Sequence, residues 1–529
     1  MPNLIESLEN RRLMSVASIS SIQLYNADTN QPISGYAPIT SGSTIDLAKL
    51  PTRHVNILAK TSTTTGSVKF GLDSSSSYHV ETYSPYFIGG DTNSKANSWS
   101  LTTGSHTLVV TAYSGASATG TAGTASTVKF TVTDSSIVAN PAPAPVGSGV
   151  TRIVDINKSA GSYSTVASAL SVANPGDVIL IKPGTYHESI KFTRSGTSSA
   201  PITIYAATTG TVTIDGTGYA YQLDGSGAAY INLQNITFDH TTSGLMTAGV
   251  RIGNHWNVTD VTVQHAMSQG MVVYGTGTTL TRVIAQYNGQ EGISGSNCSY
   301  ITLKDCVTRY NNPGMTSPQW AGQSGTSQVN GLWYVNADYQ SGAGKWVGTD
   351  HVTFDGVQSY SNHGTGIWFD GPNANVVIKN CNVHDAIPIK AFYEGVGISI
   401  EMNNTGAVTI ENNTLSNNPG GSIVIASSKH VTVQYNNITG SYIALNDWPR
   451  GDAFWMNDIT FMHNIMNNTF IWTGGDNWLA TSGVDKDIVF DYDTYKGMTG
   501  PIAKWGTGTY TTITDVRNGL KLEAHGTQV

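Results

Sequence analysis

The stretch from Val408 to Ile438 reads VTIENNTLSNNPGGSIVIASSKHVTVQYNNI, and it contains one short pattern twice. In each copy apolar residues alternate with polar ones, and a pair of asparagines follows. Between the copies a second short strand begins at a glycine. The pattern places Ile410 and Val433 at equivalent positions, 23 residues apart. A period of roughly 20 to 50 residues is typical of repeat proteins whose units stack on one another.

The same pattern runs through the second two-thirds of the chain, most often at spacings of 22 to 25 residues. One inward apolar position per repeat aligns at Leu233, Val258, Leu280, Leu303, Phe354, Ile378, Ile410, Val433, Phe461 and Phe490. Asparagine tolerates the left-handed backbone conformation of turns and can bond a stacked neighbour. The pairs Asn311-Asn312, Asn412-Asn413, Asn417-Asn418 and Asn436-Asn437 are therefore expected to form turn ladders. The sequence predicts an all-β fold, with a right-handed parallel β-helix over residues 151–529.

Two segments near the start of this region carry a family resemblance. Residues 176–186 read GDVILIKPGTY and residues 200–205 read APITIY, and both resemble the opening coils of pectate-lyase-like proteins. The preceding stretch, residues 163–173, is expected to be a short capping helix. The resemblance implies a β-helix of the kind found in carbohydrate-active enzymes, and it specifies the fold rather than the reaction.

The first 150 residues have a different organisation. Residues 17–134 contain short apolar strands separated by Ser, Thr and Gly turns, which predicts an immunoglobulin-like β-sandwich. No aromatic cluster marks a binding face there, so a spacer is favoured over a sugar-binding module. Residues 135–150 are rich in proline and alanine and predict a semi-rigid linker. Residues 1–16 resemble the LEPR-x-L-L sorting segment, with Asn10 at its proline position. This implies export to the surface or exterior of a bacterium, and a disordered tail is the alternative.

Composition narrows the classes of partner. A chain of 529 residues exceeds the usual size of one domain. The net charge of −8 argues against nucleic acid, which needs a surface rich in Lys and Arg, and mildly disfavours tight binding of a polyanionic sugar. The three cysteines (Cys298, Cys306 and Cys381) have neither a disulfide-framework pattern nor metal-ligand spacing. No apolar run reaches the length of a membrane span. The expected partner is a polysaccharide or oligosaccharide.

The repeat period breaks at two places. There are 51 residues between Leu303 and Phe354, and 32 between Ile378 and Ile410. A solenoid tolerates insertions where they loop out of one face, which is often the binding face. The first insertion, residues 313–337, carries Trp320, Trp333 and Tyr334, and the second, residues 387–395, carries Lys390, Phe392, Tyr393 and Glu394. Trp333 and Tyr393 are predicted sugar contacts, and loop anchoring is the alternative for such aromatic residues.

Two acidic residues lie between these insertions. Residues 366–370 read GIWFD and residues 397–401 read GISIE, so alignment from the glycine places Asp370 and Glu401 on one rung of neighbouring coils. The same alignment places Tyr274 and Ser296 before them and Val424 after them. Like charges on adjacent rungs repel, which favours a functional role. A strand spacing of about 4.8 Å predicts carboxyl groups near the separation found in retaining glycosidases. Solvent-facing acids stacked by chance, or bridged by a cation, are the alternative.

These two strands resemble those of glycoside hydrolase family 120, a β-helix family of β-xylosidases. In that family a G-I-W-L-D strand carries the nucleophile, and an L-F-x-E-V strand carries the general acid/base. The resemblance implies Asp370 as nucleophile and Glu401 as acid/base, although the coil between them is longer here than in the family. Glu394 follows Asp370 by 24 residues and is a rival acid/base.

Further residues are predicted to contact the sugar. Residues 342–346 read GAGKW one coil before Asp370, and Lys345 is expected to hold a substrate hydroxyl or carboxylate. The residues expected to stack on the sugar or to shape the flanking subsites are Trp346, Trp368, His363, Asp447 and Arg450. No cofactor or metal is expected for this hydrolase reaction.

Two other functions stay open. The region from Asn336 to Lys345 resembles the lysine coil of family 9 pectate lyases, which implies a lyase whose lysine takes a proton next to a uronate carboxyl with the help of Ca²⁺. The four aspartates that would hold the Ca²⁺ are missing, since Asp338 and Asp350 are the only acids nearby. A non-catalytic glycan-binding surface protein is the third alternative.

Overall fold

The computed structural model describes residues 17–52, 55–62, 64–73, 75–97, 99, 101, 104–133, 149–242, 244–316, 320–336, 340–389, 395–446, 456–473 and 486–529. The chain divides into two compact units, residues 1–138 and 139–529, and each is described by itself. The predicted sorting segment and nearly all of the predicted linker lie outside the described residues. In the described part, no helix has the length and apolar character needed to cross a membrane.

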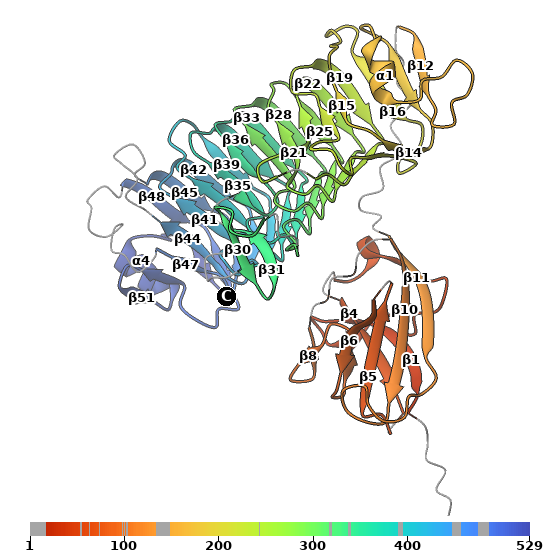
Figure 1. The fold of residues 1–529 in the computed structure, drawn as a ribbon. Coiled ribbons are helices and arrows are strands. Elements are labelled where there is room, and N and C mark those ends of the chain that lie inside the picture. Colours follow the sequence, from red (N-terminus) through yellow and green to blue (C-terminus); the bar gives the residue numbers. More distant parts are fainter. Residues whose placement is uncertain are drawn as a thin grey trace, which may run out of the picture. The chain divides into compact units, whose positions relative to one another are not determined.

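The N-terminal unit is an immunoglobulin-like β-sandwich, as the sequence predicts (Figure 1). One sheet contains β2 (Gln31–Pro32), β1 (Ile19–Asn26), β4 (Val55–Thr61) and β7 (Tyr86–Phe87). The other contains β3 (Thr44–Asp46), β11 (Ser126–Thr133), β10 (Gly104–Tyr113), β5 (Ser67–Leu72) and β6 (Ser75–Glu81). The short elements η1 (Leu47–Lys49), β8 (Asp91–Thr92) and β9 (Lys95–Ala96) lie in the connections. Alternate residues of β10, such as Leu108 and Val110, are buried in the core between the sheets.

The second unit is a right-handed parallel β-helix built from three sheets of 13 strands each. Sheet 1 contains β12 (Thr151–Val154), β13 (Val178–Ile181), β16 (Ile202–Ala206), β19 (Ala229–Gln234), β22 (Asn254–Thr259), β25 (Thr279–Thr281), β28 (Ser299–Lys304), β33 (Asp350–Asp355), β36 (Ala374–Lys379), β39 (Val408–Glu411), β42 (Lys429–Gln434), β45 (Asn457–Met462) and β48 (Lys486–Asp491). Sheet 2 contains β14 (Gly184–His187), β17 (Val212–Asp215), β20 (Thr237–Asp239), β23 (Thr262–Gln264), β26 (Ile284–Gln286), β29 (Val307–Arg309), β34 (Gln358–Tyr360), β37 (Asn382–His384), β40 (Thr414–Ser416), β43 (Asn437–Thr439), β46 (Ile465–Asn467), β49 (Thr494–Lys496) and β52 (Thr527–Gln528). Sheet 3 contains β15 (Ile190–Lys191), β18 (Leu223–Asp224), β21 (Ala248–Ile252), β24 (Gln269–Val273), β27 (Ile293–Ser296), β32 (Lys345–Val347), β35 (Ile367–Asp370), β38 (Ile398–Glu401), β41 (Ile423–Ala426), β44 (Tyr442–Asn446), β47 (Phe470–Trp472), β50 (Ala503–Trp505) and β51 (Gly508–Tyr510).

Between its two ends, each coil of the solenoid contributes one strand to each sheet, whereas β51 turns back and pairs antiparallel with β50. The predicted repeat register is confirmed. The aligned apolar positions pair in sequence along sheet 1, from Leu233 with Val258 to Phe461 with Phe490. All of them point inward into one continuous core. The helix α1 (Val166–Ser171) lies inside the range expected for a capping helix, and Thr165 accepts the Ser168 N–H at its start.

Asparagine ladders stabilise the turns between the strands. In the turn from sheet 2 to sheet 3, Asn288 Nδ2 donates to Asn311 Oδ1 at 2.9 Å, and Asn311 Nδ2 donates to Asn362 Oδ1 at 2.9 Å. A second ladder, in the turn from sheet 1 to sheet 2, joins Asn413, Asn436 and Asn464 in the same way. These amides are buried, so each unmade bond would leave a costly unpaired polar group.

The cysteines Cys298, Cys306 and Cys381 are buried free thiols.

The two insertions leave the solenoid at the same corner. Both interrupt the turn from sheet 2 to sheet 3, one between β29 and β32 and the other between β37 and β38. The first contains a hairpin of β30 (Thr326–Val329) and β31 (Leu332–Val335), drawn in green outside the stacked strands (Figure 1). The uninterrupted coil of β34 and β35 lies between the two, so the insertions flank the strand that carries Asp370.

The second asparagine ladder ends on an acid at the C-terminal end of the solenoid. Asp493 Oδ1 accepts from Asn464 Nδ2 at 3.0 Å, and Tyr495 donates to Glu523 at 2.7 Å. Glu523 follows α4 (Ile513–Leu520), and β52 then pairs with β49. Burial, followed by the charge of Glu523, raises the pKa of Asp493, and burial also raises the pKa of Glu523. The folded chain therefore retains a proton at this pair.

We expect Asp493→Asn to make the stability of the β-helix less dependent on pH. The unfolded chain ionises Asp493 in the ordinary carboxyl range, whereas the fold holds the proton, so the free energy of unfolding falls as pH rises above about 4. The slope is at most about 1.4 kcal/mol per pH unit. Asparagine accepts the same bond from Asn464 without ionising. Urea unfolding from mildly acidic to alkaline pH should give a flatter profile for the variant, whereas the outward-facing control Asp355→Asn should keep the wild-type slope. Equal slopes for both variants would contradict the expectation.

Candidate active site on the outward face of sheet 3

Strand alternation sets which side chains leave the solenoid. In β35, Ile367 and Phe369 point into the core, so Trp368 and Asp370 lie on the outer side. β35 pairs with β38 in register, and Asp370 is the partner of Glu401. The neighbours on this row are Val347 before and Ala426 after, because Val424 pairs with Ser399 instead. The prediction of Val424 on this row was wrong, but both neighbours of the two acids are still uncharged.

A lysine from the preceding coil pairs with the first acid. Lys345 Nζ lies 2.5 Å from Asp370 Oδ2 and 3.9 Å from the centroid of the Trp368 ring. The backbone of Lys345 is paired with Trp368, so its side chain crosses the indole to reach the carboxylate. The cation therefore interacts with the ring and with the carboxylate at once.

The charged groups of this cluster are largely shielded from solvent. The side chains of Lys345 and Asp370 are 11% and 13% exposed, and Glu401 is 8% exposed. A comparable pair on sheet 1, Lys379 with Asp355, is 3.7 Å apart and about one-third exposed. Shielding strengthens the electrostatic interaction of Lys345 with Asp370 relative to such a surface pair.

Two polar atoms beside the cluster are unsatisfied. Asp370 Oδ1 and Trp368 Nε1 are buried and have no hydrogen-bond partner in the described part of the chain. Buried polar atoms without partners are uncommon in folded proteins and call for an explanation. One acceptor and one donor are therefore buried without partners beside the carboxylate pair.

A buried glutamate, which the sequence analysis missed, lies next to Lys345 in the fold. Glu291 is fully buried, and its Oε2 accepts from Gln269 Nε2 and Ser294 Oγ, each at 2.7 Å. Burial raises the pKa of Glu291, while those two bonds and the nearby Lys345 act in the opposite direction. The sequence signal for Glu291 was its place directly before a glycine that begins a strand. The coils of Asp370 and Glu401 have no acid at the equivalent position.

The predicted roles of two tryptophans need correction. Trp346 is 1% exposed and packs against Phe354 and Phe369 in the core, because it occupies an inward position of β32. Trp368 is on the outward side, but it is only 5% exposed and Lys345 lies over its ring. Neither ring offers an open face to a sugar, and Trp368 instead supports Lys345.

The first insertion places its aromatic residues differently. Trp320 is 1% exposed and anchors the loop. Trp333 is half-buried on β31, where it pairs with Met315. Tyr334 contacts His363 with ring centroids 5.3 Å apart. Burial lowers the pKa of His363 to about 4, so this imidazole is neutral at physiological pH.

Four predicted site residues lie outside the described residues: Glu394, Tyr393, Asp447 and Arg450. Four other candidates, Lys345, Trp368, Asp370 and Glu401, come together on three consecutive strands of sheet 3. Trp346 faces the core, and Trp333 and His363 lie outside these strands. The structure therefore brings the two acids and the lysine together.

The surroundings of Lys345 do not fit the Ca²⁺ that a pectate-lyase-like mechanism implies. Ca²⁺ takes six to eight oxygen ligands, whereas Asp370 already has an ammonium group at 2.5 Å. Asp350 lies on sheet 1, where it accepts from Asn375 and interacts with His351. Among the described residues, no group of three possible metal ligands includes Asp370 or Glu401.

A family model points to the same fold, and several known proteins are similar to this chain. A family model described as a right handed beta helix region matches residues 243–438, and one described as chondroitinase B matches residues 160–269. Pectate lyase L of Dickeya chrysanthemi is 22% identical over 311 residues, which cover 53% of this chain and 67% of that protein. The solved structure of pectate lyase Pel9A is 18% identical, with a TM-score of 0.36 and coverage of 70% of this chain and 83% of that one. The complex of XylC with xylose is 10% identical, with a TM-score of 0.42 and coverage of 68% and 85%.

We expect Lys345→Met to destabilise the β-helix by roughly 2–4 kcal/mol, because it leaves the shielded Asp370 carboxylate without its counter-ion. Methionine preserves most of the packing over Trp368. Combining it with Asp370→Asn should recover much of the loss. The control Lys379→Met, at the exposed pair, should cost no more than about 1 kcal/mol. Chemical denaturation of the four proteins measures these differences, and equal losses for Lys345→Met and Lys379→Met would contradict the expectation.

Proposed function

We propose that the chain is a retaining glycoside hydrolase acting on a plant or algal polysaccharide or on oligosaccharides derived from it. The observation that carries the proposal is the pairing of Asp370 with Glu401 on adjacent strands, with Lys345 beside Asp370. Stacked strands lie about 4.8 Å apart, which suits the carboxyl separation of about 5–5.5 Å in retaining enzymes.

The two acids have different roles in this mechanism. Asp370 has to attack the anomeric carbon as a carboxylate, and Lys345 Nζ lies 2.5 Å from its Oδ2. As the bond from Asp370 to carbon forms, the bond to the leaving oxygen breaks and Glu401 gives that oxygen its proton. Glu401 then takes a proton from water, whose oxygen displaces Asp370 from the same carbon. Two displacements restore the original configuration.

Features outside the cluster support a glycan substrate. The two insertions flank the coil that carries Asp370, and the face from which insertions leave a solenoid is often its binding face. The net charge of −8 favours a neutral sugar over a polyanion. Together with the resemblance to family 120, these features favour β-xylosidase-like chemistry. The sorting-like segment at residues 1–16 supports export to the bacterial surface or exterior.

We expect Asp370→Asn and Glu401→Gln each to lower kcat by roughly 10³-fold or more, because each removes a group that acts in the transition state. The loss is measured as release of reducing sugar from xylan and arabinan, and as hydrolysis of aryl glycosides of their sugars. The control Glu411→Gln changes an acid on sheet 1, whose Oε2 accepts from Gln434, and should retain wild-type activity. NMR of the first product should show the anomeric configuration of the substrate. Inversion of that configuration, or near-normal hydrolysis by Asp370→Asn, would rule out the assignment.

The match to pectate lyase L favours a second candidate, a lyase that uses Lys345 as base. A lyase base has to be free to reach the proton of its substrate, whereas Lys345 Nζ already contacts Asp370 Oδ2 and lies over the Trp368 ring. Under the hydrolase proposal, incubation with polygalacturonate or alginate should give no ultraviolet-absorbing unsaturated product. Activity towards glycosides should also survive treatment with a chelator. An unsaturated product that disappears in Lys345→Met would instead establish the lyase.

A further inference from the structure

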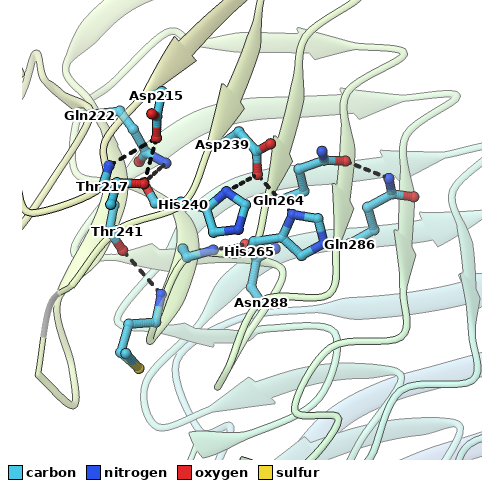
Figure 2. A network of polar contacts seen from close by, with 12 residues as sticks. Asp215, Thr217, Gln222, Asp239, His240, Thr241, Gln264, His265, Gln286 and Asn288 are labelled. Carbon is cyan, nitrogen blue, oxygen red and sulfur yellow. Dashed lines mark hydrogen bonds and ion pairs between the residues drawn. The ribbon is translucent and has the colours of Figure 1, made fainter. Parts of the chain in front are cut away.

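One carboxylate on the outer side of sheet 2 receives two imidazoles. Asp239 Oδ1 lies 2.7 Å from His265 Nδ1 and 2.9 Å from His240 Nδ1, and Figure 2 shows both rings directed towards it. These three possible ligand atoms all lie within 4.8 Å of one another. The cluster is several coils before Asp370 and shares no residue with the cluster of Lys345, Asp370 and Glu401.

The coil register produces this arrangement. Asp239 and Gln264 are paired at the ends of β20 and β23, and a histidine follows each of them. His240 and His265 have φ values of 55° and 52°, which turn both side chains out of the strand path at the same corner. Their ring centroids are 4.8 Å apart. Two successive coils therefore present their imidazoles to one acid.

Other histidines of the solenoid form simpler pairs. His187 with Asp215, His430 with Asp458 and His525 with Asp491 each join one imidazole to one carboxylate, at 3.3, 2.7 and 2.8 Å. Among the ion pairs of the described residues, Asp239 alone receives two histidines. A single pair offers too few ligands for a specific metal site, whereas the Asp239 cluster offers three.

A row of hydrogen-bonded side chains on sheet 2 orients Asp239. Arg309 Nε donates to Gln286 Oε1 at 2.9 Å, and Gln286 Nε2 donates to Gln264 Oε1 at 2.7 Å. The amide nitrogen of Gln264 is left to donate to Asp239. The side chain of Gln264 hydrogen-bonds to Asp239. Such supporting bonds fix metal ligands in productive orientations.

We propose that Asp239, His240 and His265 form a binding site for a divalent transition metal ion, with Zn²⁺ as the best-suited ion. Two imidazole nitrogens and one carboxylate oxygen suit Zn²⁺, whereas Ca²⁺ and Mg²⁺ require mainly oxygen ligands. Each histidine binds the ion through Nδ1 in the tautomer with its proton on Nε2. Each Nδ1 atom moves away from Asp239 Oδ1 by about half an ångström to reach the separation of two tetrahedral ligands. The side chains of His240 and His265 are 57% and 42% exposed, which leaves the fourth position to water.

The bound ion links two neighbouring coils at the N-terminal part of the solenoid. Its expected effect is on stability, because an ion that binds the folded chain alone shifts the unfolding equilibrium.

The test uses the full chain, freed of metal with a chelator and titrated with Zn²⁺ by calorimetry. We expect one saturable site per chain, a rise in the unfolding temperature with Zn²⁺, and a Co²⁺ absorption spectrum typical of nitrogen and oxygen ligands. Asp239→Asn and His265→Gln should each weaken Zn²⁺ binding at least tenfold and abolish the Co²⁺ spectrum. Circular dichroism without metal checks that both variants remain folded.

The matched control is His430→Gln, which removes the imidazole of an exposed single pair and should leave the affinity unchanged. The chain has 13 histidines, so weak scattered binding has to be distinguished from the site. Absence of a saturable 1:1 phase, or equal affinity in wild type, Asp239→Asn and His265→Gln, would overturn the proposal. Glycosidase activity is not the readout, so failure of this site and failure of the proposed hydrolase function remain distinguishable.

Discussion

The hydrogen bonds between successive coils require every strand to stay in phase with the strand before and after it. Strands of a parallel sheet are linked by evenly spaced backbone bonds, and a slip of one residue would turn each core side chain outward. The aligned apolar residues of sheet 1 and the buried asparagines of the turns keep this phase from coil to coil. Extra residues are accommodated where a turn can loop outward, and both long insertions occur at the corner between sheets 2 and 3.

The same phase stacks side chains of one kind on neighbouring strands, which stabilises apolar residues and destabilises residues of like charge. Apolar residues gain by stacking, whereas Asp370 and Glu401 are placed on adjacent strands where their charges repel. Lys345, one strand earlier, offsets this repulsion through its contact with Asp370. The proposed activity thus rests on an unfavourable pairing that the solenoid stabilises with one cation. Two carboxylates with unequal surroundings are also what acid/base catalysis requires, since one has to hold a proton that the other lacks.

Much of the fold follows from the spacing of residues in the sequence. The sheet 1 register was predictable because one apolar position recurs with nearly constant period, and the pairing of Asp370 with Glu401 followed from two strands that begin with the same glycine. The residue types of Lys345 and Trp346 do not show that Trp346 points inward, because that orientation depends on its place in the strand alternation. Glu291 precedes a glycine-led strand, and His240 and His265 lie one repeat apart, so the sequence holds a signal for each. Their contacts with Lys345 and Asp239 form between coils, and residue spacing alone does not give them. The positions of side chains in the long insertions likewise have no repeat to predict them.

The rows of polar side chains have a direction as well as a register. In the turn ladders each amide donates towards the C-terminal end, and one row finishes at the carboxylate of Asp493. The row on sheet 2 runs the other way, from the guanidinium of Arg309 through two glutamines towards Asp239. Aligned amide dipoles reinforce one another, and two of these rows end at a carboxylate, Asp493 in one and Asp239 in the other. Because of this polarity, one reversed amide within a row would set donor against donor and acceptor against acceptor.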